Sequence, residues 1–131
     1  MIFIDTHVLL WSILAPQNLS AKAKKILKKE EEEKSVFASA ISVWEIYLLV
    51  KKGRISLSTD TDSWIEDVER LNFLHFIPID NRIAARSVTL PGDFHGDPAD
   101  RMIVATAREK GMVIITKDER IRKYPHVQTV W

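Results

Sequence analysis

The sequence predicts an α/β protein in which helices cover both faces of a central, mainly parallel sheet of four to five strands, a three-layer α/β/α arrangement. Short apolar runs alternate with longer amphipathic segments along the chain, which is typical of parallel strands connected by helices. The short runs are rich in Ile, Val and Phe, and the longer segments carry apolar residues at helical spacing. No linker, internal repeat or low-complexity stretch is visible, so we expect residues 1–131 to form a single domain.

The first part of the chain predicts one strand and two helices. The apolar run Met1–Asp5 predicts a short buried strand. Thr6–Leu14 predicts a helix that Pro16 brings to an end. Ser20 is a favourable N-cap, so the next helix is expected at Ala21–Glu33.

The middle part predicts two strands, each next to a helix. Ser35–Ala38 is expected to be the second strand, and Ile41–Lys52 a helix that ends at Gly53. After a connector, Thr61–Asn72 has one apolar face and predicts a further helix. Phe73–Ile79 is the third predicted strand.

The last part predicts three more helices and two strands. Asp80 is a good cap for a helix at Asn81–Leu90, and Pro98–Lys110 predicts the helix that follows. The continuous apolar run Met112–Thr116 predicts the fourth strand. The remaining expectations are a short helix at Asp118–Tyr124 and an edge strand at Val127–Val130.

The composition narrows the class of protein. The net charge of +1 neither requires nor excludes a nucleic-acid partner, because a local basic patch is compatible with it. The chain has no cysteine, which excludes disulfides and thiolate metal sites and fits a cytoplasmic protein. No apolar run reaches the roughly 18 residues of a membrane span. No basic segment precedes the first apolar stretch, so we expect neither a signal peptide nor a membrane partner.

Two carboxylates stand alone in apolar segments. Asp5 is the only Asp, Glu, Lys or Arg in the first 21 residues, and Glu45 is the only one between Lys34 and Lys51. Burying a carboxylate costs several kcal/mol unless another group compensates its charge. No Lys or Arg in either segment can do so, and this favours a bound cation.

Further acids border apolar runs in the same way. Ligands of an open parallel sheet bind at the carboxyl ends of its strands. Asp5 closes the first predicted strand, and Thr116 and Asp118 follow the fourth. Asp97 and Asp100 open the helix that precedes the fourth strand. We therefore expect distant acids to converge in one pocket.

Each acid also has a structural explanation. Asp5 and Asp118 are possible N-caps of the helices they precede, and Asp97 followed by Pro98 is a strong cap signature. Glu45 is harder to explain, since it lies mid-helix among large apolar residues, although an exposed stripe on that helix remains an alternative. A purely structural role is less expected for all of these acids together than for any single one of them.

Clustered carboxylates favour one kind of chemistry. Ligands that offer only oxygen suit Mg²⁺ or Mn²⁺. Such ions activate a water and stabilise the leaving oxygen of a phosphodiester. The residues alone thus lead to metal-assisted phosphodiester hydrolysis. For the mechanism, we predict in-line attack of water on phosphorus, which leaves a 5′-phosphate and a 3′-hydroxyl.

Four segments in order resemble the PIN-domain ribonucleases, specifically the VapC-like toxins of bacterial and archaeal toxin–antitoxin pairs. The resemblance covers essentially the whole chain, and the ending Tyr124-Pro125 with a terminal Trp131 is also typical of one subgroup. The four segments are Ile4-Asp5-Thr6-His7-Val8-Leu9-Leu10-Trp11, Ser42-Val43-Trp44-Glu45-Ile46, His95-Gly96-Asp97-Pro98-Ala99-Asp100-Arg101-Met102-Ile103 and Ile115-Thr116-Lys117-Asp118.

The resemblance implies a Mg²⁺- or Mn²⁺-dependent endoribonuclease that is homodimeric and is blocked by a small antitoxin. It implies that the catalytic, metal-binding acids are Asp5, Glu45, Asp100 and Asp118. Asp97 is the extra acid of the subgroup, and its role as direct ligand, water-mediated ligand or cap is open. Thr116 matches a hydroxyl position that would orient Asp118 or a water.

Other matching positions have weaker implications. His7 and His95 match subgroup positions and would donate hydrogen bonds near a phosphate or serve structure. Arg101 would reach the scissile phosphate or pair with acids. Trp11 and Trp44, like Trp64, lie at the spacing of core or interface residues.

Three other functions remain open from the sequence. A phosphatase with Asp5 as nucleophile usually needs a second Asp two residues later, where this chain has His7. A receiver-like switch would use Asp80 as its phosphorylated residue, but it leaves Glu45 without a role. A degenerate PIN domain would bind RNA or an antitoxin without cleaving, although all four acids are present.

Overall fold

The computed structural model describes residues 1–131 and contains one five-stranded, all-parallel sheet with the strand order β3-β2-β1-β4-β5. The strands are β1 (Ile2–Ile4), β2 (Val36–Ser39), β3 (Leu74–Ile77), β4 (Ile114–Ile115) and β5 (Thr129–Val130). The helices are α1 (Thr6–Leu14), α2 (Ala21–Glu32), α3 (Ala40–Lys51), α4 (Thr61–Glu69), α5 (Asn81–Val88), α6 (Pro98–Lys110) and α7 (Glu119–Arg122), with a 3₁₀ turn η1 at Pro16–Asn18.

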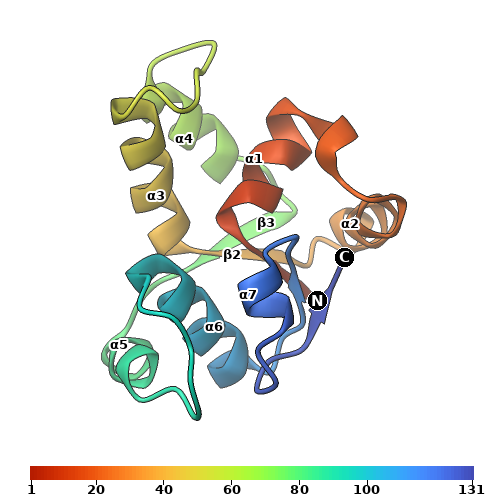
Figure 1. Cartoon of the computed structure of the whole chain (residues 1–131). Helices are drawn as coiled ribbons and strands as arrows, with labels where there is room; N and C mark the ends of the chain where they lie inside the picture. The colour runs from red at the N-terminus through yellow and green to blue at the C-terminus, as the bar shows by residue number, and fades with distance from the viewer.

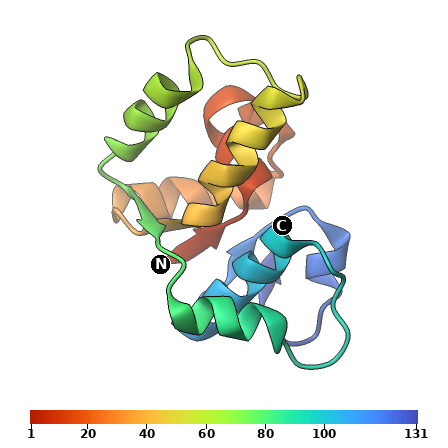
Figure 2. The same cartoon turned by 90° about the vertical axis from the view of Figure 1, so that its left-hand side faces the viewer.

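Helices pack on both faces of the sheet, so the predicted three-layer α/β/α class is confirmed. Helices α1–α4 lie on one side of the sheet and α5–α7 on the other (Figures 1 and 2). None of these helices combines the length and the apolar character that a membrane span requires.

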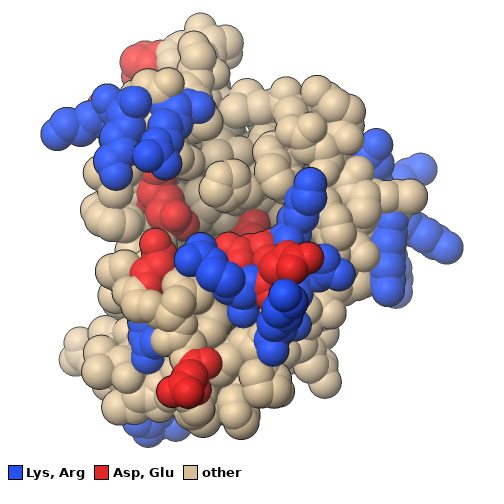
Figure 3. All heavy atoms as spheres, in the orientation of Figure 1, with Lys and Arg blue, Asp and Glu red and all other residues tan.

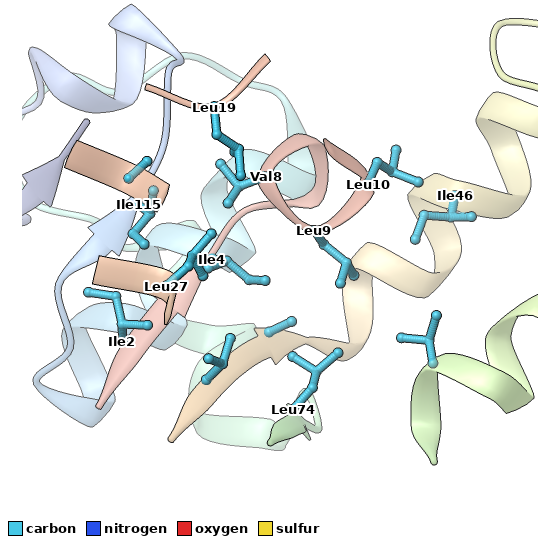
Figure 4. Packing of buried hydrophobic residues seen from close by; sticks show 14 of the residues in the cluster. Ile2, Ile4, Val8, Leu9, Leu10, Leu19, Leu27, Ile46, Leu74 and Ile115 are labelled. Atoms are coloured by element: carbon cyan, nitrogen blue, oxygen red, sulfur yellow. The ribbon is translucent and has the colours of Figure 1, made fainter. Parts of the chain in front are cut away.

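The two faces have separate apolar cores because side chains alternate along each strand. On β1, Ile2 and Ile4 pack with the α1–α4 cluster, which Figure 4 shows from close by, whereas Phe3 packs with the α5–α7 cluster. Ile115 and Ile114 divide between the same two clusters on β4. All five of these side chains are buried, which explains why the central strands read as continuous apolar runs.

Most predicted elements exist, with shifted ends. The helices predicted at Thr6–Leu14 and Pro98–Lys110 have those bounds. The predictions were too long for the third strand, which ends at Ile77, and for the helix after Asp60, which ends at Glu69. The fourth and fifth strands are also shorter than predicted, with two residues each, and the turn η1 was not predicted.

The order of the strands creates a place for a site. The chain adds β2 and β3 on one side of β1 and then returns to add β4 and β5 on the other side. The order therefore reverses between β1 and β4, and parallel sheets bind ligands outside the carboxyl ends of strands at such a point. Asp5 directly follows β1, and Thr116 directly follows β4.

Candidate active site

A cavity of about 390 Å³ opens at this end of the sheet. In Figure 3, red acidic atoms gather in and beside a hollow in the middle of the displayed face, with blue basic side chains next to them. The four acids predicted for the site all line this cavity, although they come from four separate segments. The lining residues are Asp5, Thr6, His7, Trp11, Glu45, Asp100, Ile103, Lys117 and Asp118.

Asp5 is the most deeply buried of these acids, with 7% of its surface exposed. It is the N-cap of α1, and its Oδ1 accepts a hydrogen bond of 2.8 Å from the Val8 amide. Its Oδ2 accepts a hydrogen bond from the Thr116 hydroxyl, which ties β1 to β4. Burial raises the pKa of Asp5, and the bonds from Thr116 and Val8 partly oppose that rise. Capping and a place in the cavity are therefore combined in one residue.

Glu45 points from the middle of α3 toward the start of α1. The Thr6 hydroxyl donates a hydrogen bond of 2.5 Å to Glu45 Oε1 and lies 2.8 Å from the Ser42 hydroxyl. Thr6 and Ser42 are buried and were not among the residues predicted for the site. The available signal was position, since Thr6 follows Asp5 and Ser42 is three residues before Glu45, which puts Ser42 and Glu45 on neighbouring positions of one helix face.

Asp100 and Asp118 share a cation from their own chain. One terminal nitrogen of Arg120 lies 3.4 Å from Asp100 Oδ2 and 3.5 Å from Asp118 Oδ2. Asp118 also caps α7, with its Oδ1 accepting a hydrogen bond of 2.8 Å from the Arg120 amide. Arg120 thus stands between two carboxylates that border the cavity.

The pKa values of Asp100 and Glu45 are raised by burial and by the negative charges of neighbouring acids. Burial, followed by the charges of Asp97, Asp118 and Glu45, raises the pKa of Asp100 to about 7, although Arg120 opposes the rise. Burial is also the main reason that the pKa of Glu45 is raised. Carboxylates that resist ionisation together favour a cation near them.

Asp97 is the cap of α6 and is not part of the cavity lining. Its Oδ1 accepts a hydrogen bond of 2.9 Å from the Asp100 amide. Its own amide donates to His95 Nδ1 at 3.3 Å, which leaves the proton of a neutral imidazole on Nε2. His95 Nε2 lies 3.1 Å from Asp100 Oδ2, but it lacks hydrogen-bond geometry there and has no other partner. Burial lowers the pKa of His95.

Arg101 has a different position from the one expected. Its guanidinium donates to the carbonyl oxygens of Ser87, Val88, Phe94 and His95, over distances of 2.7 to 3.2 Å. It forms no ion pair with an acid and does not line the cavity, so neither expected role fits its contacts. Arg101 instead ties the end of α5 to the loop that carries His95.

The chemistry of the four carboxylates fits Mg²⁺ or Mn²⁺, which prefer oxygen ligands. As the side chains stand, no three His, Asp or Glu groups are arranged so that they could hold one metal ion. Hydrogen bonds turn Asp5 toward Thr116 and Glu45 toward Thr6, while Arg120 faces the other two acids. The four acids therefore line one cavity without pointing at one common position.

The chain is similar to known proteins over almost its whole length. The sequence profile of the PIN domain family matches residues 2–127. Ribonuclease VapC22 of Mycobacterium tuberculosis is 36% identical to this chain over 132 residues, which span 99% of this chain and 98% of the relative.

Solved structures share the fold at lower identity. FitAcB from Neisseria gonorrhoeae superposes with a TM-score of 0.71 and 22% identity, over 100% of this chain and 97% of the other. VapBC2 from Rickettsia felis, bound to a DNA fragment from its promoter, gives a TM-score of 0.70 and 14% identity, over 99% and 98% of the two chains. A toxin–antitoxin complex from Klebsiella pneumoniae gives 0.66 and 21%, over 100% and 97%.

Proposed function

The chain belongs to the PIN domain family, and from this premise we propose that it is a Mg²⁺- or Mn²⁺-dependent endoribonuclease, the toxin of a toxin–antitoxin pair. The observation that carries the proposal is the convergence of Asp5, Glu45, Asp100 and Asp118 on one cavity. The name of the VapC22 relative supports RNA as the substrate.

We assign the four acids as the residues that hold the metal. When bound, Mg²⁺ or Mn²⁺ would activate a water for attack on phosphorus and stabilise the charge on the leaving oxygen. Within the chain, the Thr116 hydroxyl orients Asp5, and the Thr6 hydroxyl orients Glu45. Such supporting hydroxyls fix the direction of ligand oxygens. Asp97 holds the first turn of the helix that carries Asp100.

The direct test is cleavage of RNA by the purified protein with Mg²⁺ or Mn²⁺, with EDTA, and with the variant Asp5→Asn. We expect cleavage that EDTA stops and that Asp5→Asn lowers at least about 100-fold, because a metal contributes several kcal/mol to the transition state. Asp93→Asn is the matched control, since Asp93 is an exposed acid outside the cavity.

Three results would contradict the proposal. If Asp5→Asn keeps full metal-dependent activity, Asp5 is not one of the catalytic residues. Products with a 2′,3′-cyclic phosphate, in place of a 5′-phosphate and a 3′-hydroxyl, would indicate attack by the ribose hydroxyl. If the protein binds RNA but cleaves none, it is a binding module, which is the alternative to a nuclease.

We also propose that the chain is a single PIN domain, forms a homodimer and binds an antitoxin. We further propose that it acts on RNA in the cytoplasm. Structural relatives that are toxin–antitoxin complexes support the partner. On helix α3, Trp44 is 50% exposed and Tyr47 is 39% exposed. Large aromatic side chains exposed together support the proposal that another protein chain binds at this surface. Light scattering of the purified chain tests the dimer, and a monomer at micromolar concentration would contradict it.

A further inference from the structure

The cavity has an aromatic and basic wall in addition to its acids. Trp11, His7 and Lys117 line the same cavity as the four carboxylates. Trp11 and His7 both belong to α1, which starts directly after Asp5, and being four residues apart they share one helix face. Lys117 lies between Thr116 and Asp118, after β4. An aromatic surface and a cation thus stand beside the acids proposed to act on a phosphodiester.

The ring of Trp11 is held in place without being stacked against another ring. Its centroid lies 5.7 Å from that of His7 and 6.1 Å from that of Trp131, and the planes are tilted by 54° and 58°. Neither neighbour is parallel to Trp11, and Trp11 is only partly buried. His7 and Trp131 therefore lie near the ring without stacking in parallel on it, and the ring still lines the cavity.

Besides the two aromatic neighbours, the side chain of Lys117 lies near the ring of Trp11. Its ammonium lies 6.0 Å from the Trp11 centroid, at the outer limit of a cation–π contact, and its side chain is exposed. A contact at this distance holds a flexible lysine weakly. The ammonium is thus free to turn toward a phosphate and uncover the ring.

We propose that Trp11 stacks on one unpaired base of the RNA next to the scissile phosphate, with Lys117 contacting a neighbouring phosphate. This inference rests on the proposed ribonuclease function. Aromatic side chains recognise unstacked bases of single-stranded RNA by stacking on them. In a duplex the face of each base is covered by its neighbours, so paired RNA does not offer Trp11 a partner.

Binding without divalent metal tests the subsite apart from catalysis. Fluorescence anisotropy in EDTA would measure the affinity of a labelled 12-nucleotide single-stranded RNA and of its duplex. Stacking is worth about 1–3 kcal/mol per base, so we expect Trp11→Leu to weaken single-strand binding about 5- to 150-fold and duplex binding little. Trp11→Phe keeps a ring and should lose less than Trp11→Leu. Val88→Ala is the control, because Val88 is exposed and outside this cavity.

Probes that lack one base in turn identify the contact directly. If Trp11 stacks on a particular base, removal of that base from the RNA should weaken binding to the wild-type protein. The same removal should have no further effect on binding to Trp11→Leu, which has already lost the contact. If Trp11→Leu does not fold, as judged by circular dichroism, the same cycle is made with Trp11→Phe. Equal affinities of wild type and variant for the single strand, or base and side-chain effects that simply add, would overturn the stacking proposal.

Failure of this subsite and failure of the nuclease proposal give different results. A protein that cleaves RNA with metal but binds it independently of Trp11 has the proposed activity without the subsite. A protein that binds single-stranded RNA through Trp11 but cleaves none has the subsite without the activity.

Discussion

Both carboxylate oxygens of Asp5 accept hydrogen bonds from the surrounding structure, so this residue stabilises the fold and also lines the cavity. One oxygen accepts from the Val8 amide and caps α1, while the other accepts from the Thr116 hydroxyl. Thr116 is itself fully buried and accepts a bond of 3.0 Å from the Asp118 amide. A small change at Thr116 therefore reaches two of the acids.

Replacing Thr116 by Val should lower stability and activity together. The variant leaves one oxygen of the buried Asp5 carboxylate without a donor, which costs about 1–3 kcal/mol. It also raises the pKa of Asp5 further, because the Thr116 bond opposes the effect of burial. Urea denaturation measures the loss, and Thr116→Ser, which keeps the hydroxyl, is the control. Equal stability of the Val variant and the wild type would contradict this role.

Asp100 should make the metal-free protein less stable as pH rises. Its pKa is raised from 3.8 to about 7 in the folded protein, so between these values the folded state binds more protons than the unfolded state. The free energy of unfolding therefore falls as pH rises from about 4 to about 7. Melting temperatures of the wild type and of Asp100→Asn, measured in EDTA across this range, should differ in slope. Parallel curves would show that Asp100 titrates normally.

At the scale of elements, the α5–α6 connection depends on Arg101. This side chain bonds to carbonyls at the end of α5 and in the loop, and so holds His95 beside Asp100. The sequence motif identified an Arg in this position but not its partners, because backbone carbonyls carry no signal in the sequence. Its contacts appear only once the loop has folded back along α6.

Replacing Arg101 by Met should loosen this loop. The change leaves four carbonyl oxygens without their charged donor, and we expect a loss of about 2–3 kcal/mol in the free energy of unfolding. Hydrogen exchange should become faster in residues 89–97, while exchange in β1 stays as in the wild type. Arg101→Lys, which keeps the charge but not the fork of donors, should fall between the two. Unchanged exchange in the loop would contradict the role given to Arg101.

Helix starts could be predicted from the sequence more easily than strand ends. Ser20, Asp60, Asp80 and Asp97 each accept a backbone bond at the start of a helix, and the type of such capping residues is visible in the sequence. The third strand ends before Pro78, where the chain lacks an amide donor for the ladder. The apolar run at Met112–Thr116 is longer than β4, because pairing with β1 and β5 sets the strand length.

At the scale of the whole molecule, the cavity depends on the order of the strands. The resemblance to the PIN-domain ribonucleases was needed to choose Asp100 and Asp118, whereas Asp5 and Glu45 could be predicted because each stands alone in an apolar segment. Thr6, Lys117 and Arg120 could not, since their positions relative to the acids depend on how β1, β4 and α7 pack. A sequence pattern gives the type of ligand more readily than the groups that orient it.

Divalent metal should stabilise the entire fold if the four acids bind it. At 100 times the dissociation constant, binding adds about 2.7 kcal/mol, which corresponds to roughly 10 °C in the melting temperature. Mn²⁺ should produce this shift in the wild type and little of it in Asp5→Asn, with ionic strength matched by NaCl. An equal shift in both proteins would indicate that the metal binds elsewhere.

The hydrogen bond between Thr116 and Asp5 joins residues 111 positions apart. Synthesis starts at the N-terminus, so Asp5 leaves the ribosome long before β4 exists to pair with β1. A nascent chain therefore cannot complete the cavity until translation is almost finished.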